Sequence, residues 1–168
     1  MKYCSKCGTQ VNDDAVVCMN CGCSVASPAA QRSAAPVGKL KTNRGLLKFI
    51  LLSIITFGIY GIVVMSSVST DINVIAGRYD GKKTMHFCLV LFIFSWLTFG
   101  IVPLVWYHRI SSRIGAELNR RGLGYSFGAG TFWGWNILGS FIVVGPFIYI
   151  HKLLKAMNLL AENYNVRG

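Results

Sequence analysis

Three long windows of this chain contain no charged side chain, and they restrict its possible folds more than any other feature. Residues 49–70, 84–108 and 122–151 lack Asp, Glu, Lys and Arg altogether. Roughly 20 helical residues cross the ~30 Å hydrocarbon core of a bilayer, so each window is long enough to do so. One such window would fit a buried helix of a soluble protein, but three in a chain of 168 residues predict an integral membrane protein.

The composition supports this prediction. Hydrophobic residues make up 53% of the chain, and 17 Lys and Arg against 6 Asp and Glu give a net charge of +11. A chain this hydrophobic is not a disordered tail. Its basic residues flank the apolar windows, where they are placed to meet anionic lipid headgroups. The lipid bilayer and its anionic headgroups are therefore the first expected partners.

The N-terminal cysteines have the spacing of a zinc site. Two C-x2-C pairs, each followed by glycine, are separated by ten residues. Such pairs place four thiolates around one tetrahedral ion, which predicts a structural Zn²⁺ in a zinc ribbon over residues 1–23. Four thiolates leave no open coordination position, so catalysis by the metal is not expected. The predicted ligands are Cys4, Cys7, Cys18 and Cys21. Cys23 is interpreted as a thiol that does not bind the metal, and Cys88, in an apolar window, as a small buried hydrophobic residue.

The composition changes after the cysteines. Residues 24–43 are rich in Ala, Ser and Pro, which is typical of a flexible linker, and residues 44–168 form the expected helical transmembrane domain. The sequence before Cys4 has no apolar stretch of the length that a signal peptide needs. We therefore expect the protein in the inner or plasma membrane with its N-terminus in the cytosol, where thiols stay reduced.

The membrane half repeats itself three times. The stretch that begins at Thr56 is repeated at Thr98, 42 residues later, and a third copy begins near Phe141. Polar residues match as well as apolar ones, since Asn73 of the first copy corresponds to Asn158 of the third. A period of this length indicates one supersecondary unit used three times. The fold expected is all-α, with repeats at about 46–83, 86–124 and 129–168.

Each unit is an apolar run, a Gly or Pro break and an amphipathic helix. The helices have apolar stripes that we expect to face other helices or the lipid interface. The sequence leaves two topologies open. The units either cross the membrane as kinked spans, or turn back at the break as re-entrant hairpins, because the run before each break is too short to cross alone. The stripes are Met65, Val68, Ile72, Ile75 and Tyr79, then Tyr107, Ile110, Ile114 and Leu118, then Ile150, Leu153, Met157, Leu160 and Tyr164.

Aromatic and basic residues gather where apolar windows end. This pattern predicts anchoring at the membrane interface. The alternative is a metal or headgroup site built from His108 and His151. The predicted interface residues are Trp106, Tyr107, His108, Arg109, Tyr149, His151 and Lys152.

Two motifs resemble those of a bacterial integral-membrane family of unknown function. They are the Thr-x-Gly-Ile-Tyr run of residues 56–60 and the Asp-Ile-Asn of residues 71–73. The resemblance covers roughly residues 44–165, and members similar to this chain often carry an N-terminal zinc ribbon. It implies no catalytic residues.

The functional hypothesis is therefore a non-enzymatic, membrane-embedded module whose cytosolic zinc ribbon recruits a protein partner. The alternative is a membrane protein that acts on lipids or small permeants, with the ribbon as a regulator. Binding of nucleic acid is disfavoured, because Lys2 and Lys6 are offset by Asp13 and Asp14 and the ribbon has no basic patch.

Overall fold

The computed structural model describes residues 2–4, 7–11, 18, 20–21, 36 and 38–168. The chain divides into two compact units, residues 1–37 with the last two residues, and residues 38–166. The first unit contains the antiparallel strands β1 (Lys2–Tyr3) and β2 (Gln10–Val11). The second unit is helical, so the protein is mostly α-helical with a small N-terminal ribbon. It includes residues 38–43, the last part of the stretch interpreted as a linker, of which residues 24–35 and 37 lie outside the description.

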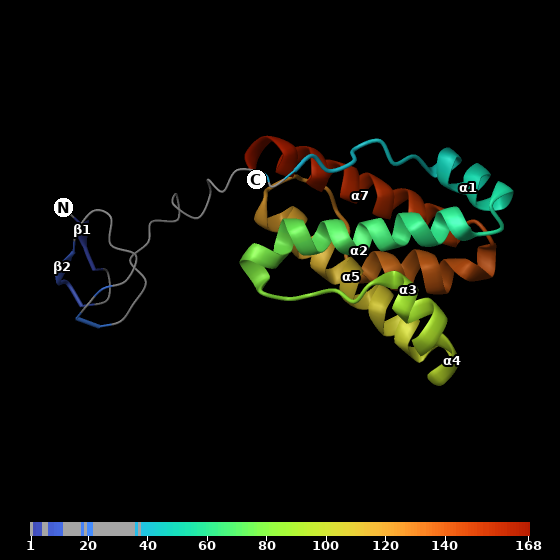
Figure 1. Ribbon diagram of the computed structural model, residues 1–168, viewed down its shortest axis with the longest axis horizontal. Helices are drawn as coiled ribbons and strands as arrows, with labels where there is room; N and C mark the ends of the chain where they lie inside the picture. The colour runs from blue at the N-terminus through green and yellow to red at the C-terminus, as the bar shows by residue number, and fades with distance from the viewer. Residues whose placement is uncertain (1, 5–6, 12–17, 19, 22–35, 37) are drawn as a thin grey trace. The chain divides into compact units, whose positions relative to one another are not determined.

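The helical unit consists of three successive hairpins, in each of which a shorter helical arm precedes a long helix (Figure 1). The first hairpin joins α1 (Leu46–Ile55) to α2 (Ile59–Asp80). The second joins α3 (Phe87–Leu89), the π-helical η2 (Val90–Phe94) and α4 (Ser95–Leu97) to α5 (Ile101–Arg120). The third joins α6 (Ala129–Thr131), η3 (Phe132–Ile137) and η4 (Leu138–Ile142) to α7 (Gly145–Arg167).

The long helices α5 and α7 run parallel to each other. The hydroxyl of Ser111, midway along α5, lies 2.8 Å from the hydroxyl of Tyr149, near the start of α7. Near their ends, Arg121 Nη1 donates to Asn163 Oδ1 at 2.8 Å. The partners are separated by about the same number of residues in both cases, which is possible only if the two helices point the same way.

The helices α2 and α5 are parallel by the same reasoning. Arg113 Nη1 donates to Asn73 Oδ1 at 2.5 Å, and the Arg120 guanidinium lies 3.5 Å from the centre of the Tyr79 ring. Three parallel helices have their first residues at one end, and each is preceded by its hairpin turn. The three turns therefore lie toward the same end of the helical unit, on the right in Figure 1, where the turn between α4 and α5 lies below the other two.

The first two turns share one structure. The Thr56 hydroxyl donates to the carbonyl four residues before it at 2.6 Å and accepts from the N–H four residues after it at 2.9 Å. Thr98 makes the same two bonds, at 2.6 and 3.2 Å. The residue after each threonine, Phe57 or Phe99, has a left-handed φ of 51° or 48°, and a left-handed glycine follows it. Stretches that the sequence aligns 42 residues apart thus form the same turn.

The apolar stripes form the core between the three long helices. Most of their members are buried, and Tyr107 and Ile150 are partly buried against the same cluster. Tyr79 differs, because it lies in the last turn of α2, is 36% exposed and is covered on one face by Arg120. The buried members are Met65, Val68, Ile72, Ile75, Ile110, Ile114, Leu118, Leu153, Met157, Leu160 and Tyr164.

A non-helical lead-in segment precedes each hairpin, over residues 38–45, 81–86 and 122–128. The second and third segments also return the chain from one hairpin to the next, as parallel long helices require. Asn73 of α2 holds the second segment, since its side chain accepts from the Thr84 N–H at 2.7 Å and donates to the Thr84 carbonyl at 2.8 Å. An asparagine side chain has one amide donor and one carbonyl acceptor, as a neighbouring strand does. It can therefore pair with both the N–H and the C=O of one residue in the lead-in segment.

Two asparagines of α7 hold the first lead-in segment in the same way. Asn158 pairs with both backbone groups of Arg44, at 3.1 and 2.8 Å, and Asn165 pairs with both backbone groups of Leu40, at 2.8 and 2.9 Å. The Arg44 side chain continues into an ion pair with Asp71 of α2. The first segment is therefore fastened to the helix at the far end of the sequence.

Gly115 of α5 occupies the corresponding place for the third lead-in segment. It lies 42 residues after Asn73, and its missing side chain leaves room for the backbone of residues 127–128. A Cβ atom at Gly115 would overlap the carbonyl oxygen of Phe127. Here the segment is held by direct contact with the helix instead of by an asparagine.

We expect Gly115→Ala to destabilise the helical unit. Both this change and the control Gly130→Ala remove a helical glycine, which alone favours the helix by about 1 kcal/mol. A Cβ at Gly130 meets nothing within 4 Å, whereas one at Gly115 must displace backbone, at a cost of about 1–3 kcal/mol. Thermal unfolding in detergent should give the lower midpoint for Gly115→Ala. Equal midpoints would contradict the close contact.

Candidate metal centre and polar network

The ribbon places two cysteine pairs around one point. A hydrogen bond from the Gly8 N–H to the Cys4 carbonyl at 2.8 Å closes the first loop, and Gly8 has a left-handed φ of 69° that glycine adopts without strain. The Cys4 N–H donates to the Thr9 carbonyl at 2.9 Å, which ties the loop to the segment entering β2. Cys4 and Cys18 are buried, and Cys7 is exposed.

The four sulfur atoms have the separations that a tetrahedral zinc requires. All of them lie within 4.8 Å of one another. Cys4 and Cys21 have their Sγ atoms 3.6 Å apart, as do Cys7 and Cys18. Zinc–sulfur bonds of about 2.3 Å in a tetrahedron place sulfurs about 3.8 Å apart, so the donor set fits a structural Zn²⁺. In the described part of the chain, no other three His, Cys, Asp or Glu side chains converge in this way. Cys23 lies outside that part.

Cys7 is prepared for metal binding by a neighbour. Hydrogen bonds from the side chain and backbone of Thr9 lower the pKa of the Cys7 thiol to about 6. The thiolate is the form that binds a metal, so less free energy is needed to deprotonate this ligand.

The helical unit distributes the predicted interface residues between its inside and its surface. Trp106 is 5% exposed, with its indole N–H donating to the Met85 carbonyl at 2.7 Å, and Tyr149 is fully buried. Tyr107 is half-buried and stacks on Phe132 with ring centres 5.7 Å apart. These three aromatic residues thus belong to a ring cluster between α5 and α7.

The polar members of the set lie outside. His108, Arg109 and His151 are exposed, and Lys152 is half-buried with its amine 5.8 Å from the Trp135 ring centre. His108 Nδ1 accepts from the Trp133 indole at 3.0 Å. Contact of these side chains with a membrane interface stays a prediction, as does a joint site of His108 and His151.

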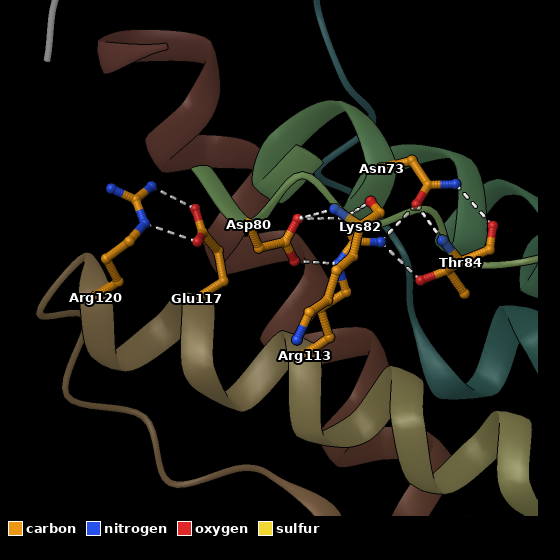
Figure 2. A network of polar contacts seen from close by, with 7 residues as sticks. All are labelled: Asn73, Asp80, Lys82, Thr84, Arg113, Glu117 and Arg120. Atoms are coloured by element: carbon orange, nitrogen blue, oxygen red, sulfur yellow. Dashed lines mark hydrogen bonds and ion pairs between the residues drawn. The ribbon is translucent and has the colours of Figure 1, made fainter. Parts of the chain in front are cut away.

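A polar network that sequence reasoning missed joins α2 and α5 at the end opposite the turns. Figure 2 shows Arg113 pointing from α5 toward Asp80, Asn73 and Thr84. Its Nε and Nη2 donate to the Asp80 carboxylate at 2.6 and 2.9 Å, Nη1 donates to Asn73 and Thr84, and Nη2 also reaches the Lys82 carbonyl at 2.5 Å. All five N–H donors of Arg113 are used. The offset match of Asn73 with Asn158 was the available signal that position 73 matters.

A buried carboxylate completes this end of the helical unit. Glu117 is 4% exposed and accepts from Arg120 at 2.8 and 2.5 Å and from Arg121 at 2.7 Å. Burial by itself raises the pKa of this carboxyl, but the hydrogen bonds from both arginines outweigh it and lower the pKa below its usual range. Glu117 therefore stays charged at neutral pH and ties together the last turn of α5.

Comparison with protein families agrees with this division of the chain. Residues 3–25 match the zinc-ribbon domain, and residues 44–116 match the family described as a domain of unknown function (DUF4234). The second match covers the first hairpin and most of the second. No curated protein and no solved structure matches the chain. The resemblance inferred from the sequence, a zinc ribbon followed by a domain of unknown function, is thus confirmed.

We expect the purified protein to carry one zinc per chain. Cys18→Ser should lose it, because three thiolates and a hydroxyl bind zinc far more weakly than four thiolates. Cys88→Ser is the matched control, since Cys88 lies in the helical unit and contacts the Ser66 hydroxyl at 3.2 Å. Metal analysis after dialysis measures both. Full zinc content in Cys18→Ser would contradict the four-cysteine site.

Proposed function

We propose that this chain, a zinc ribbon joined to a helical domain of unknown function, is a non-enzymatic membrane module. In this proposal the three hairpin turns enter the bilayer from the cytosolic side, and the ribbon recruits a protein partner there. The observation that carries the membrane part is the exposure of large apolar side chains at the end of the helical unit toward which all three turns point.

The turns present their largest side chains to the outside. Phe57 is 97% exposed, Phe99 is 98% exposed and Phe141, just before the third turn, is 89% exposed. Phe57 and Phe99 have a left-handed backbone, which costs a residue with a side chain about 1–3 kcal/mol. A phenyl ring exposed to water gains no free energy that would offset this strain, whereas a phenyl ring transferred into hydrocarbon does.

The residues around the turns add further exposed apolar side chains. An exposed apolar patch of more than a few hundred Å² is rare on soluble monomers and marks a membrane or protein contact. Its residues with more than half of their surface exposed are Leu51, Ile54, Ile55, Ile59, Phe92, Ile93, Trp96, Leu97, Ile101, Leu138, Ile142, Val143 and Val144.

The position of the nearest cations supports hairpins that enter one leaflet. Lys48, Arg109 and Lys152 are each nine or ten residues from the centre of their turn. At 1.5 Å of rise per residue this is about 14 Å, close to half of the ~30 Å hydrocarbon core. With these cations at the headgroups, all three turns reach the middle of the bilayer.

The helix lengths favour the same topology over kinked spans. Among the described residues, α2 is the one helix long and apolar enough to cross a membrane. The arms Leu46–Ile55 and Phe87–Leu97 are shorter. Arms of this length cover about 15 Å, so a hairpin that turns back suits them and a span does not.

The ribbon supports recruitment because its zinc site is structural, with all coordination positions filled by protein. Four thiolates leave no coordination position for a substrate, so the zinc serves to hold a small surface in shape. The ribbon and the helical unit belong to different compact units of the chain. The second candidate function, action on lipids or small permeants with the ribbon as regulator, keeps the same membrane geometry.

One-sided labelling tests the hairpin topology. In a Cys88→Ser background, cysteines replace Lys83, Asn119 and Glu162, which are exposed near the ends of the three units. A membrane-impermeant maleimide should label all three from the cytosolic side and none from the opposite side. The parent without added cysteines corrects for the ribbon thiols. Opposite sides for positions 83 and 119 would establish kinked spans instead.

A comparative pull-down from native membranes tests recruitment. Wild type is compared with Cys4→Ser/Cys7→Ser, and Cys88→Ser is the control that keeps the zinc site. A partner present in stoichiometric amount should be lost from the first variant together with zinc and kept by the second. The same proteins captured by all three forms would refute recruitment by the ribbon and favour the lipid or permeant alternative.

A further inference from the structure

A groove of about 900 Å³ lies along α5, between this helix and the lead-in segment of residues 81–86. Toward the turn end its walls are apolar and include Val90, Val102 and Val105. Toward the other end they carry Lys82 and Lys83 from the segment, and Arg109 from α5. The lining of the groove therefore changes from apolar near the turns to basic farther from them.

Two charged side chains of the groove already form hydrogen bonds with each other and with the surrounding protein. Arg113 uses all five donors on Asp80, Asn73, Thr84 and the Lys82 carbonyl, and Asp80 accepts two of them. This ion pair is neutral as a unit, and it fixes the segment that carries Lys82 and Lys83 against α5. Arg113 thus shapes the groove and has no donor left for a ligand.

The remaining charges of the groove are all positive. Lys83 and Arg109 are exposed and form no ion pair with any acid in the described part of the chain. Asp80, the acidic residue in the wall, is held by Arg113. A ligand that reaches the basic end consequently meets cations whose charge is not compensated by protein.

We propose that this groove binds one anionic phospholipid. Its phosphodiester headgroup lies between Lys83 and Arg109, and one acyl chain lies along Val102 and Val105 toward the turns. The inference deepens the proposed function and rests on it for the direction of the lipid, because the acyl chain must point the same way as the inserted turns.

The groove fits part of one acyl chain below the proposed headgroup. Its wall on α5 extends from Arg109 to Val102, which at 1.5 Å of rise per residue is about 10 Å. This length lies within the about 15 Å that one leaflet contributes to the hydrocarbon core. A soluble anion such as glycerol phosphate would occupy the basic end alone and leave the apolar wall without a contact.

The test is lipid binding by the full-length protein in neutral detergent micelles. Phosphatidylglycerol or phosphatidylcholine is added, and bound lipid per chain is measured by native mass spectrometry. Wild type should hold one phosphatidylglycerol in preference to phosphatidylcholine. Lys83→Gln/Arg109→Gln should bind phosphatidylglycerol about 30-fold more weakly, as expected for two cations near an anionic headgroup.

The matched control is Lys39→Gln/Lys41→Gln. These two lysines are also exposed, and their substitution also lowers the net charge by two. They lie in the first lead-in segment and are not among the residues that line the groove. The control should bind phosphatidylglycerol as wild type does. Equal loss in both double variants would overturn the proposal, because binding would then follow net charge alone. Displacement of the lipid by glycerol phosphate at equal concentration would also overturn it.

A second measurement separates this inference from the proposed function. Flotation with vesicles of phosphatidylcholine alone tests entry of the turns through their apolar side chains, and both wild type and Lys83→Gln/Arg109→Gln should float. Vesicles with one quarter phosphatidylglycerol should retain wild type better than the variant. Flotation without this difference overturns the groove and leaves membrane entry standing, whereas no flotation on either vesicle overturns membrane entry.

Discussion

The structure depends on how three parallel helices are connected. Each hairpin is preceded by a lead-in segment that runs along a long helix. The backbone N–H and C=O groups of such a segment need partners if they are to be buried against the helix. Asn73, Asn158 and Asn165 supply those partners from side chains, and Gly115 allows direct contact instead. These contacts fasten each lead-in segment to a long helix and so help to fix where the hairpins lie around the core.

The arginines distribute charge along the same axis. In the helical unit, Asp71, Asp80 and Glu117 each have an arginine partner, and these pairs lie away from the turns. A buried pair with further hydrogen bonds loses much more when one partner is removed than it gains in net stability. The pairs therefore serve to fix the geometry of the helical unit, and other basic residues, such as Lys83 and Arg109, remain exposed without an acidic partner in the described part of the chain.

The sequence predicts the parts whose physics is local. Cysteine spacing identifies the zinc ligands, and helical periodicity identifies the three core stripes. Tyr79 is the exception, because it lies in the last turn of α2 and is partly exposed. Hydropathy measures the length of an apolar segment but not its direction, so it leaves spans and hairpins open. Trp106 and Tyr149 have the pattern of an interface belt, yet an aromatic cluster between helices has the same pattern. The Arg113 network joins residues from two hairpins, and no local pattern reveals it.

In the proposed topology, the shared direction of the three turns has a mechanical consequence. A body that enters a bilayer only as far as the midplane displaces lipid from one leaflet and leaves the other at its original area. Such an insertion behaves as a wedge, and its free energy depends on the lateral pressure and curvature of the leaflet that receives it. The left-handed phenylalanines at the tips would then make this protein sensitive to the shape of a membrane as well as to its charge.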